Sequence, residues 1–352
     1  MRIAVEQFGT TAKGEVVNLY TLQNENGFRV VLSNYGAIIV SVFAKDINGN
    51  FDDIVSGFDT LAGYEKNPGF YGAVIGPYAN RIRGAKITVD GIDYPLKVNE
   101  NGKNTLHSDQ ELGIHKAVWT AKLKEAENAV EFRTWVRDME MGFPGNKEIT
   151  VTYSVTEDNS IRIHYHATSD KNTAINLTNH SYFNLDGNHA GKILDTELQI
   201  LADQITPIDK ECIPTGEFLD VTGTPFDFRS PKKIGQDIGA VDEQLAFGGG
   251  YDHNFVLQNQ SGEVRLIARA VSHKSGRVME VYTDQPGVQL YTGNFMENPM
   301  GKDGKGYGKR EGFCLETQVY PNAINETAFP DPIYGPQKEY DTVTEYRFKE
   351  EA

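Results

Sequence analysis

The feature that most constrains the fold of this chain is a regular alternation of mostly apolar residues with polar residues between positions 130 and 167. The alternation comes in three runs, separated by segments rich in Gly, Pro, Asn and Asp, the residues that favour turns. The residues expected on the buried face of each strand are Val130, Phe132, Thr134 and Val136, then Ile149, Val151, Tyr153 and Val155, then Ile161, Ile163, Tyr165 and Ala167. A period of two is typical of half-buried strands, so these runs predict successive antiparallel hairpins.

The same pattern returns at 30–44, 263–270 and 278–283, whereas helical periodicity is weak and confined to 59–65 and 232–238. Thirty-five glycines and fourteen prolines provide the many connections that a large sandwich needs. A chain of 352 residues exceeds the usual domain size, but all-β sandwiches often reach such lengths as one unit. We expect an all-β protein, a large antiparallel β-sandwich, that forms a single domain over 1–352.

Charge and cysteine content narrow the class of function. The formal net charge is -15, from 49 acidic and 34 basic residues, which opposes binding to phosphate backbones or anionic lipid. Nucleic acid and membranes are therefore not expected as partners. Two cysteines are too few for a disulfide framework, the N-terminus lacks the apolar run of a signal peptide, and no stretch is long enough for a membrane span. We expect a cytoplasmic protein, a monomer or a homodimer.

The segment 176–185, with the sequence NLTNHSYFNL, is the first candidate for chemistry. It crowds donors and acceptors, among them His180 and Tyr182, into a strand-like run, where burying them without partners would be costly. The alternative is a satisfied hydrogen-bond network around a core histidine. The density of polar groups favours a ligand site.

Two other strand-like segments carry polar residues among apolar ones. In 286–295 the residues Gln289 and Tyr291 share one face, which can present an amide and an aromatic ring to a ligand, or be the polar face of an edge strand. In 313–321 apolar residues flank Glu316, and desolvation there would raise the pKa of its carboxyl and make it a better base. The alternative is a carboxylate on the wet face of a strand.

Three more candidates lie in loop-like regions. Asn80 and Arg81 follow a glycine-rich stretch, and His107 lies in a second loop. The guanidinium of Arg81 offers a fork of donors that suits vicinal hydroxyls. Alone, each of these residues is equally compatible with a solvated surface position.

A metal site and a phosphate site are both disfavoured. His164 and His166 share one face of a predicted strand, at a spacing that can bind metal, but no cysteine or third ligand lies nearby in the sequence. The Gly- and Lys-rich segment 301–312 lacks the order of a P-loop and the G-x-G-x-x-G spacing. We therefore expect no metal and a plain loop.

Taken together and in order along nearly the whole chain, these segments resemble the aldose 1-epimerase, or galactose mutarotase, family. The strongest is 179–185, NHSYFNL. The supporting segments are 79–82 (ANRI), 213–216 (IPTG), 226–229 (FDFR), 251–253 (YDH), 289–292 (QLYT) and 315–318 (LETQ).

The resemblance implies the fold called a supersandwich, with an open sugar cleft across one sheet, and a cofactor-free enzyme that interconverts the α and β anomers of a free hexose such as galactose or glucose. It also implies roles for individual residues. His180 matches the general acid and Glu316 the general base, with His107 as a third catalytic group. The positions that match sugar-binding residues are Asn80, Arg81, His107, Tyr182, Asp252 and Gln289.

Two segments depart from the usual family pattern. Where the family often has Gly-Arg before the Ala-Asn-Arg segment, this chain has Gly76-Pro77-Tyr78. Where it often has His-Gly-Gly, this chain has His107-Ser108-Asp109. Both departures leave the acid and base positions unchanged.

Three other functions fit parts of the sequence. A hexose-6-phosphate epimerase would need a basic cluster beside the cleft, and the only one is the loop that carries Lys302, Lys305, Lys309 and Arg310. A non-catalytic sugar-binding protein would not need both His180 and Glu316. A glycosidase would use two carboxylates, here Asp252 and Glu316, whereas the acid role matches a histidine.

Overall fold

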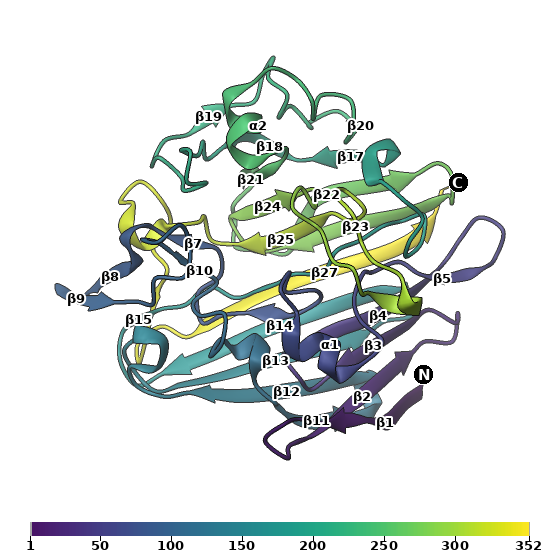
Figure 1. The fold of residues 1–352 in the computed structure, drawn as a ribbon, viewed down its shortest axis with the longest axis horizontal. Coiled ribbons are helices and arrows are strands. Elements are labelled where there is room, and N and C mark those ends of the chain that lie inside the picture. The colour runs from purple at the N-terminus through teal and green to yellow at the C-terminus, as the bar shows by residue number, and fades with distance from the viewer. Residues whose placement is uncertain (1, 352) are drawn as a thin grey trace.

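The computed structural model describes residues 2–351, which form mostly antiparallel strands in three large sheets (Figure 1). The first sheet has five strands in chain order: β1 (Arg2–Thr10), β2 (Val16–Gln23), β3 (Arg29–Ser33), β4 (Ile38–Lys45) and β5 (Phe51–Asp53). The second has nine, in the order β11 (Thr120–Lys124), β12 (Ala129–Val136), β13 (Lys147–Val155), β14 (Ser160–Ser169), β27 (Tyr340–Glu350), β23 (Arg277–Thr283), β22 (Arg265–Ser272), β17 (Glu197–Ile200) and β20 (Lys232–Lys233). The third has five, in the order β19 (Leu219–Asp220), β18 (Ala202–Ile205), β21 (Asp252–Leu257), β24 (Gly287–Tyr291) and β25 (Cys314–Gln318).

The three predicted hairpin strands are confirmed as the neighbours β12, β13 and β14 of the nine-stranded sheet. Their register places Phe132 opposite Val151, and Val151 opposite Tyr165. All three side chains are buried, so the apolar face of the alternation forms one wall of the core. The expected all-β architecture is confirmed.

Both five-stranded sheets cover the same face of the nine-stranded sheet. On β27, Tyr346 and Phe348 point to one face because they are two residues apart. Phe348 stacks on Phe28 beside the first sheet, with ring centroids 5.5 Å apart, and the Tyr346 hydroxyl donates to the Leu315 carbonyl of the third sheet at 2.9 Å. The core is therefore a layer between one long sheet and two shorter ones.

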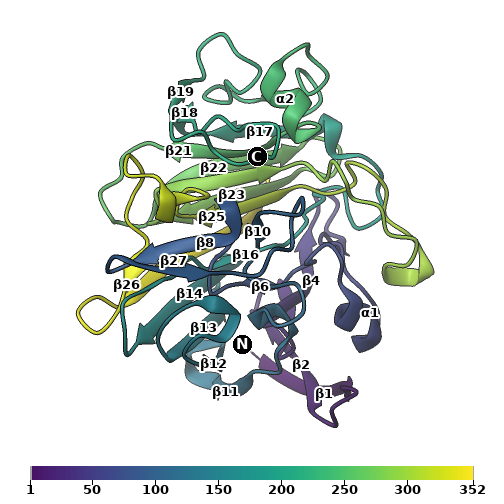
Figure 2. The same ribbon diagram turned by 60° about the vertical axis from the view of Figure 1, so that its left-hand side comes forward.

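Short two-stranded elements lie along and beyond the line where the two five-stranded sheets approach each other, one of them projecting at the left edge of Figure 1 (Figures 1 and 2). These are β16 (Thr178–Asn179) with β6 (Val74–Ile75), β7 (Arg81–Ile82) with β10 (Thr105–Leu106), β8 (Lys86–Val89) with β9 (Ile92–Pro95), and β15 (Thr173–Ala174) with β26 (Ile333–Tyr334). Strand β16 contacts β25 of the third sheet. Residues from distant parts of the sequence thus converge at this line.

Of the two expected helical segments, one is confirmed and one is wrong. Helix α1 (Leu61–Lys66) overlaps the first and ends one residue beyond it, whereas 232–238 begins with strand β20 and continues as turns. The second helix, α2 (Glu243–Gly248), forms later because Asp242 caps its first turn by accepting from the Gln244 and Leu245 amides. Within residues 2–351 neither helix has the length and hydropathy that crossing a bilayer requires.

Candidate active site

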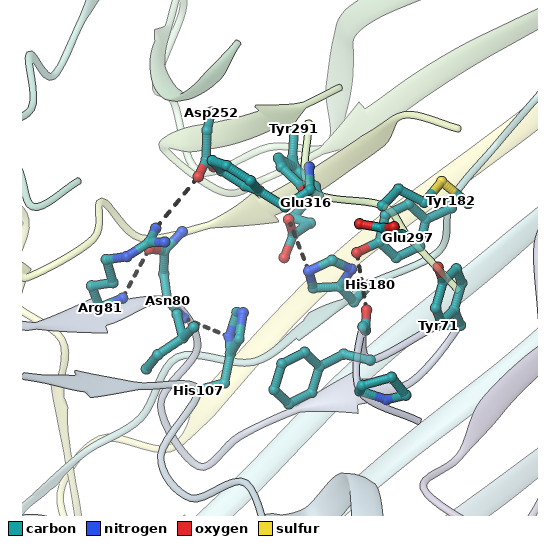
Figure 3. A pocket seen from close by; sticks show the side chains of 16 residues that line it. Tyr71, Asn80, Arg81, His107, His180, Tyr182, Asp252, Tyr291, Glu297 and Glu316 are labelled. Atoms are coloured by element: carbon teal, nitrogen blue, oxygen red, sulfur yellow. Dashed lines mark hydrogen bonds and ion pairs between the residues drawn. The ribbon is translucent and has the colours of Figure 1, made fainter. Parts of the chain in front are cut away.

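A cleft of about 270 Å³ opens at the junction of the small strands and the third sheet (Figure 3). Seven of the eight residues singled out in the sequence line it: Asn80, Arg81, His107, His180, Tyr182, Asp252 and Glu316. The eighth, Gln289, lies behind Asp252 and donates to its carboxylate at 2.7 Å. The sequence segments therefore do converge on one site.

His180 and Glu316 face each other at the floor of the cleft. His180 directly follows β16, Glu316 lies in the middle of β25, and both are buried, with 6% and 3% of their surface exposed. The Nε2 atom of His180 lies 3.7 Å from Oε1 of Glu316, longer than a direct hydrogen bond. Oε2 of Glu316 has no hydrogen-bond partner among residues 2–351. The pair is thus buried but not satisfied by the protein.

Burial shifts the proton affinities of this pair in opposite directions. It lowers the pKa of His180 to about 4. It raises the pKa of Glu316 well above the usual range, and the charge of Asp252 adds to this effect. When one proton is shared between the two groups, the pair has two forms. Either the imidazole is neutral and Glu316 is a carboxylic acid, or the imidazole is protonated and Glu316 is a carboxylate. The two forms are tautomers because they hold the same number of protons. Burial of both groups disfavours charge on either one and therefore favours the neutral tautomer.

His107 is held in one tautomer by the backbone. The Asn80 amide donates to Nδ1 of His107 at 3.1 Å, which leaves the proton of the neutral ring on Nε2. Burial lowers the pKa of His107 well below the usual range, so the ring stays neutral. Asn80 and His107 both have positive φ, 65° and 54°, a backbone conformation that non-glycine residues rarely adopt. Such strain is typical of functional sites.

The two segments that depart from the family pattern contact each other. The Ser108 hydroxyl accepts from the amide of Tyr78 and donates to its carbonyl, both at 2.9 Å. Ser108 also adopts a positive φ of 64° and is fully buried. This serine therefore ties the loop of His107 to the segment that leads into Asn80 and Arg81.

The opposite end of the cleft is a network of paired charges. Arg81 reaches Glu100 at 3.0 Å and Asp252 at 3.6 Å. Burial opposes the charge on Arg81, but the two carboxylates outweigh it and leave the pKa of the guanidinium above its ordinary value. Gln289 connects Asp252 to Gln318, whose amide donates to the Gln289 carbonyl oxygen at 3.3 Å. Asp252 and Arg81 are therefore held in fixed positions.

Aromatic rings form the remaining wall. Tyr182 lies 5.0 Å from the His180 ring and 4.6 Å from Tyr71, between centroids, and its hydroxyl donates to the Gly69 carbonyl at 3.0 Å. Phe70 contacts His107 and His180, with centroids 4.7 and 5.9 Å away. No sequence signal pointed to Phe70 or Tyr71.

Cys314 is a third residue that sequence reasoning missed. Its Sγ lies 3.6 Å from Nδ1 of His180. Burial raises the pKa of the Cys314 thiol, so the sulfur stays a thiol and can accept weakly from an Nδ1–H group. With the proton of the neutral ring on Nδ1, the lone pair of Nε2 faces Glu316 and can share its proton. A signal was present, because Cys314 and Glu316 are two residues apart on one strand and share a face.

His107, His180 and Glu316 could also hold a metal ion, since one potential ligand atom from each lies within 4.8 Å of the others. The pair His164 and His166 lies on the solvent side of β14, where the rings contact Asp341 at 2.9 Å and Glu339 at 3.0 Å. Among the described residues, the potential metal position is therefore the one at the cleft floor formed by His107, His180 and Glu316, and not the pair His164 and His166.

The chain matches the family model described as aldose 1-epimerase over residues 18–347. It is 42% identical over 333 residues to galactose mutarotase from Bos taurus, covering 94% of each chain. The chain belongs to the aldose 1-epimerase family. It is also 36% identical to the aldose 1-epimerase of Escherichia coli (strain K12), covering 95% of this chain and 96% of that protein.

Solved structures agree with this family membership. An aldose epimerase homologue from C. elegans superposes with a TM-score of 0.88 at 30% identity, covering 96% of this chain and all of that one. A galactose 1-epimerase from Lactobacillus acidophilus gives 0.87 at 25% identity over the whole of both chains. The expected galactose mutarotase-like fold is confirmed.

Proposed function

We propose that this member of the aldose 1-epimerase family interconverts the α and β anomers of free hexoses such as D-galactose and D-glucose, with Glu316 as base and His180 as acid. The observation that carries the proposal is the buried pair at the cleft floor, whose nearest nitrogen and oxygen lie 3.7 Å apart and whose Oε2 has no partner among the described residues. The reaction requires one group that accepts a proton and one that donates it, which is what such a pair provides. The enzyme is an isomerase.

Ring opening uses the ion-pair tautomer. Glu316 accepts the proton of the C1 hydroxyl while His180 donates its Nε2 proton to the ring oxygen, as the bond from that oxygen to C1 breaks and the aldehyde forms. Rotation about the C1 to C2 bond and the reverse transfers close the ring from the other face. The C1 hydroxyl also gives the buried Oε2 of Glu316 a donor, which the protein itself does not supply. Substrate thereby stabilises the charged form of the pair.

The other cleft residues hold the sugar while C1 reacts. Arg81 and Asp252, fixed by their mutual ion pair, suit adjacent hydroxyls, as one donates and the other accepts. The Nε2–H of His107 is placed to donate to a ring or hydroxyl oxygen. Gln289 acts through Asp252, and the ring of Tyr182 packs against the apolar face of the sugar. Asn80 sets the tautomer of His107 through its amide.

The hexose-6-phosphate alternative lacks its basic cluster. Lys302 is buried and bonded to Asp53 at 2.6 Å, and Arg310 donates to the Gly249 carbonyl at 3.1 Å. Lys305 and Lys309 are exposed but do not line the cleft. The one guanidinium in the lining is already paired with two carboxylates.

We further propose that the chain acts as one domain without a cofactor, in the cytoplasm, as a monomer or homodimer. One continuous core cluster contains residues from all three large sheets, which supports a single unit. Cys212 and Cys314 are both unpaired, which suits a reducing compartment. Size-exclusion chromatography with light scattering measures the oligomeric state.

Polarimetry of freshly dissolved α-D-galactose and α-D-glucose tests the function. The protein should bring both solutions to anomeric equilibrium well ahead of the spontaneous rate. The variant Glu263→Gln, in an exposed loop beyond the far end of β21, is a suitable control and should match the wild type. A wild-type rate equal to the spontaneous rate on both sugars would contradict the proposal.

A further inference from the structure

The cleft has a charged residue that the reaction does not use. Glu297 lines the cleft from the loop that joins β24 to β25, and Figure 3 draws it at the end that holds Tyr182 and Tyr71, away from Arg81 and Asp252. Its side chain is exposed and adds an acidic group to that end of the cleft. Glu297 is thus placed where a sugar enters or leaves.

The loop holds Glu297 in place on both sides. Its neighbours Met296 and Asn298 are buried, with 3% and 8% of their surface exposed. Asn298 and Tyr307 exchange backbone hydrogen bonds at 2.9 and 2.7 Å, and the Tyr307 hydroxyl accepts from the Gly57 amide at 3.0 Å. The backbone that carries Glu297 is therefore held at the rim of the cleft.

The position of Glu297 matters because the cleft lining has more acidic groups than cationic ones. The described lining carries three carboxyl groups, those of Asp252, Glu297 and Glu316, and with Glu316 neutral two negative charges remain against the single guanidinium of Arg81. Arg81 is already paired with Asp252 and Glu100. Glu297 is the one carboxyl of the three that is exposed and has no ion pair or hydrogen bond within residues 2–351. A cleft with this balance attracts cations and repels anions before contact.

We propose that Glu297 is a specificity determinant that makes the cleft select neutral and cationic hexoses, such as protonated amino sugars, over anionic ones, such as uronic acids and sugar phosphates. The inference rests on the proposed function and adds a substrate class to it. The discrimination is electrostatic, so it weakens as ionic strength rises.

Competition measurements test this proposal. D-galactosamine and D-galacturonate are compared as competitors of D-galactose mutarotation at about pH 6.5 and low salt, where an amine is mostly protonated and a carboxylic acid ionised. Each inhibition constant is divided by the Michaelis constant for galactose of the same variant, which removes any general effect on the site. The series is wild type, Glu297→Gln and Glu297→Lys, with Glu263→Gln as the charge-matched control.

The wild type should bind galactosamine more tightly than galacturonate. Glu297→Gln should shrink that ratio by about 3- to 10-fold, and Glu297→Lys by more, as expected for one charge a few ångströms from the ligand in a partly solvated cleft. Glu263→Gln should leave it unchanged. A ratio that stays within about twofold of wild type in both Glu297 variants, or that moves equally in the control, would overturn the inference.

The two proposals can fail separately. Normal galactose turnover with an unchanged ratio removes the role of Glu297 and leaves the function. If galactose is not turned over, calorimetric titration of the same variants with galactosamine and galacturonate yields the same ratio from binding alone, and the same outcomes support or overturn the role of Glu297.

Discussion

The two ends of the cleft floor differ in how well their polar groups are satisfied. At one end Arg81 is paired with Glu100 and Asp252, and Asp252 also accepts from Gln289. At the other end His180 has only a thiol contact to Nδ1, and Oε2 of Glu316 has no partner among the described residues. The paired end fixes positions, while the unpaired end retains the capacity to bind and move protons.

This difference also separates stability from function. A buried ion pair that is complete is costly to break, because removal of one partner leaves a charge uncompensated. A buried carboxyl group without a donor is a cost that the folded state bears until the substrate binds. Substitutions at the two ends should therefore affect different quantities.

The largest effect is expected for Glu316→Gln, which removes the base but keeps the shape. The turnover number should fall by about 10²- to 10⁴-fold, while sugar affinity changes little. The free energy of unfolding at neutral pH should rise by about 1 kcal/mol, because the raised pKa of Glu316 makes the folded state take up a proton that the unfolded state does not bind, and the amide has no such cost. Polarimetry, calorimetry and urea denaturation measure the three quantities. A large loss of affinity with unchanged turnover would assign Glu316 to the paired end.

Arg81→Gln should produce the converse pattern. Loss of the guanidinium leaves Asp252 and Glu100 without their cation, so the free energy of unfolding should fall by about 3 kcal/mol. The Michaelis constant for galactose should rise by about tenfold or more, and the turnover number should change less. Polarimetric rates over a range of galactose concentrations separate the two parameters. An unchanged Michaelis constant would show that the ion pair does not hold the sugar.

The pH dependence sharpens the comparison because burial shifts the pKa values of His180 and Glu316, the two groups of the unpaired end, in opposite directions. The pair at the cleft floor is active with one proton, so kcat/KM should stay level down to about pH 4, the pKa of His180 in the free enzyme, and then fall about tenfold per pH unit. On the alkaline side it should fall when the raised pKa of Glu316 is passed and the pair loses its proton. Circular dichroism at each pH excludes unfolding as the cause. An acid limb near pH 6.5 would show that His180 is not desolvated.

The smallest effect concerns the thiol behind His180. Cys314→Ala removes the weak sulfur acceptor that faces Nδ1 and should lower the turnover number by about 2- to 10-fold, with little change in the Michaelis constant. Cys314→Ser keeps an acceptor and should recover most of the loss. Equal rates for the alanine and serine variants would show that the contact does not set the tautomer.

Much of the fold could be predicted because its signal is local. The strands β12 to β14 each have one buried face and one face toward solvent. Apolar and polar residues therefore alternate between positions 130 and 167, and this alternation is visible in the sequence alone. The helical pattern at 232–238 failed because a short apolar spacing does not make a helix without a cap. Asp242 provides that cap ten residues later.

The site was only partly predictable, because its geometry depends on register between strands far apart in sequence. β24 pairs with β25 so that Gln289 lies opposite Glu316, and β21 pairs with β24 so that Asp252 lies opposite Tyr291. These pairings place Gln289 behind Asp252, a detail that no single segment contains. The contact between Ser108 and Tyr78 likewise joins two loops whose link is not visible in the sequence.

A double-mutant cycle by polarimetry tests the central claim that His180 and Glu316 act as one proton-sharing pair. The rates of α-D-galactose mutarotation are compared for the wild type, His180→Gln, Glu316→Gln and the double variant. The account predicts that each single variant loses about 10²-fold or more and that the double variant loses little beyond the worse single one, because either change disables the same pair. Losses that multiply in the double variant, or a single variant that keeps the wild-type rate, would contradict it.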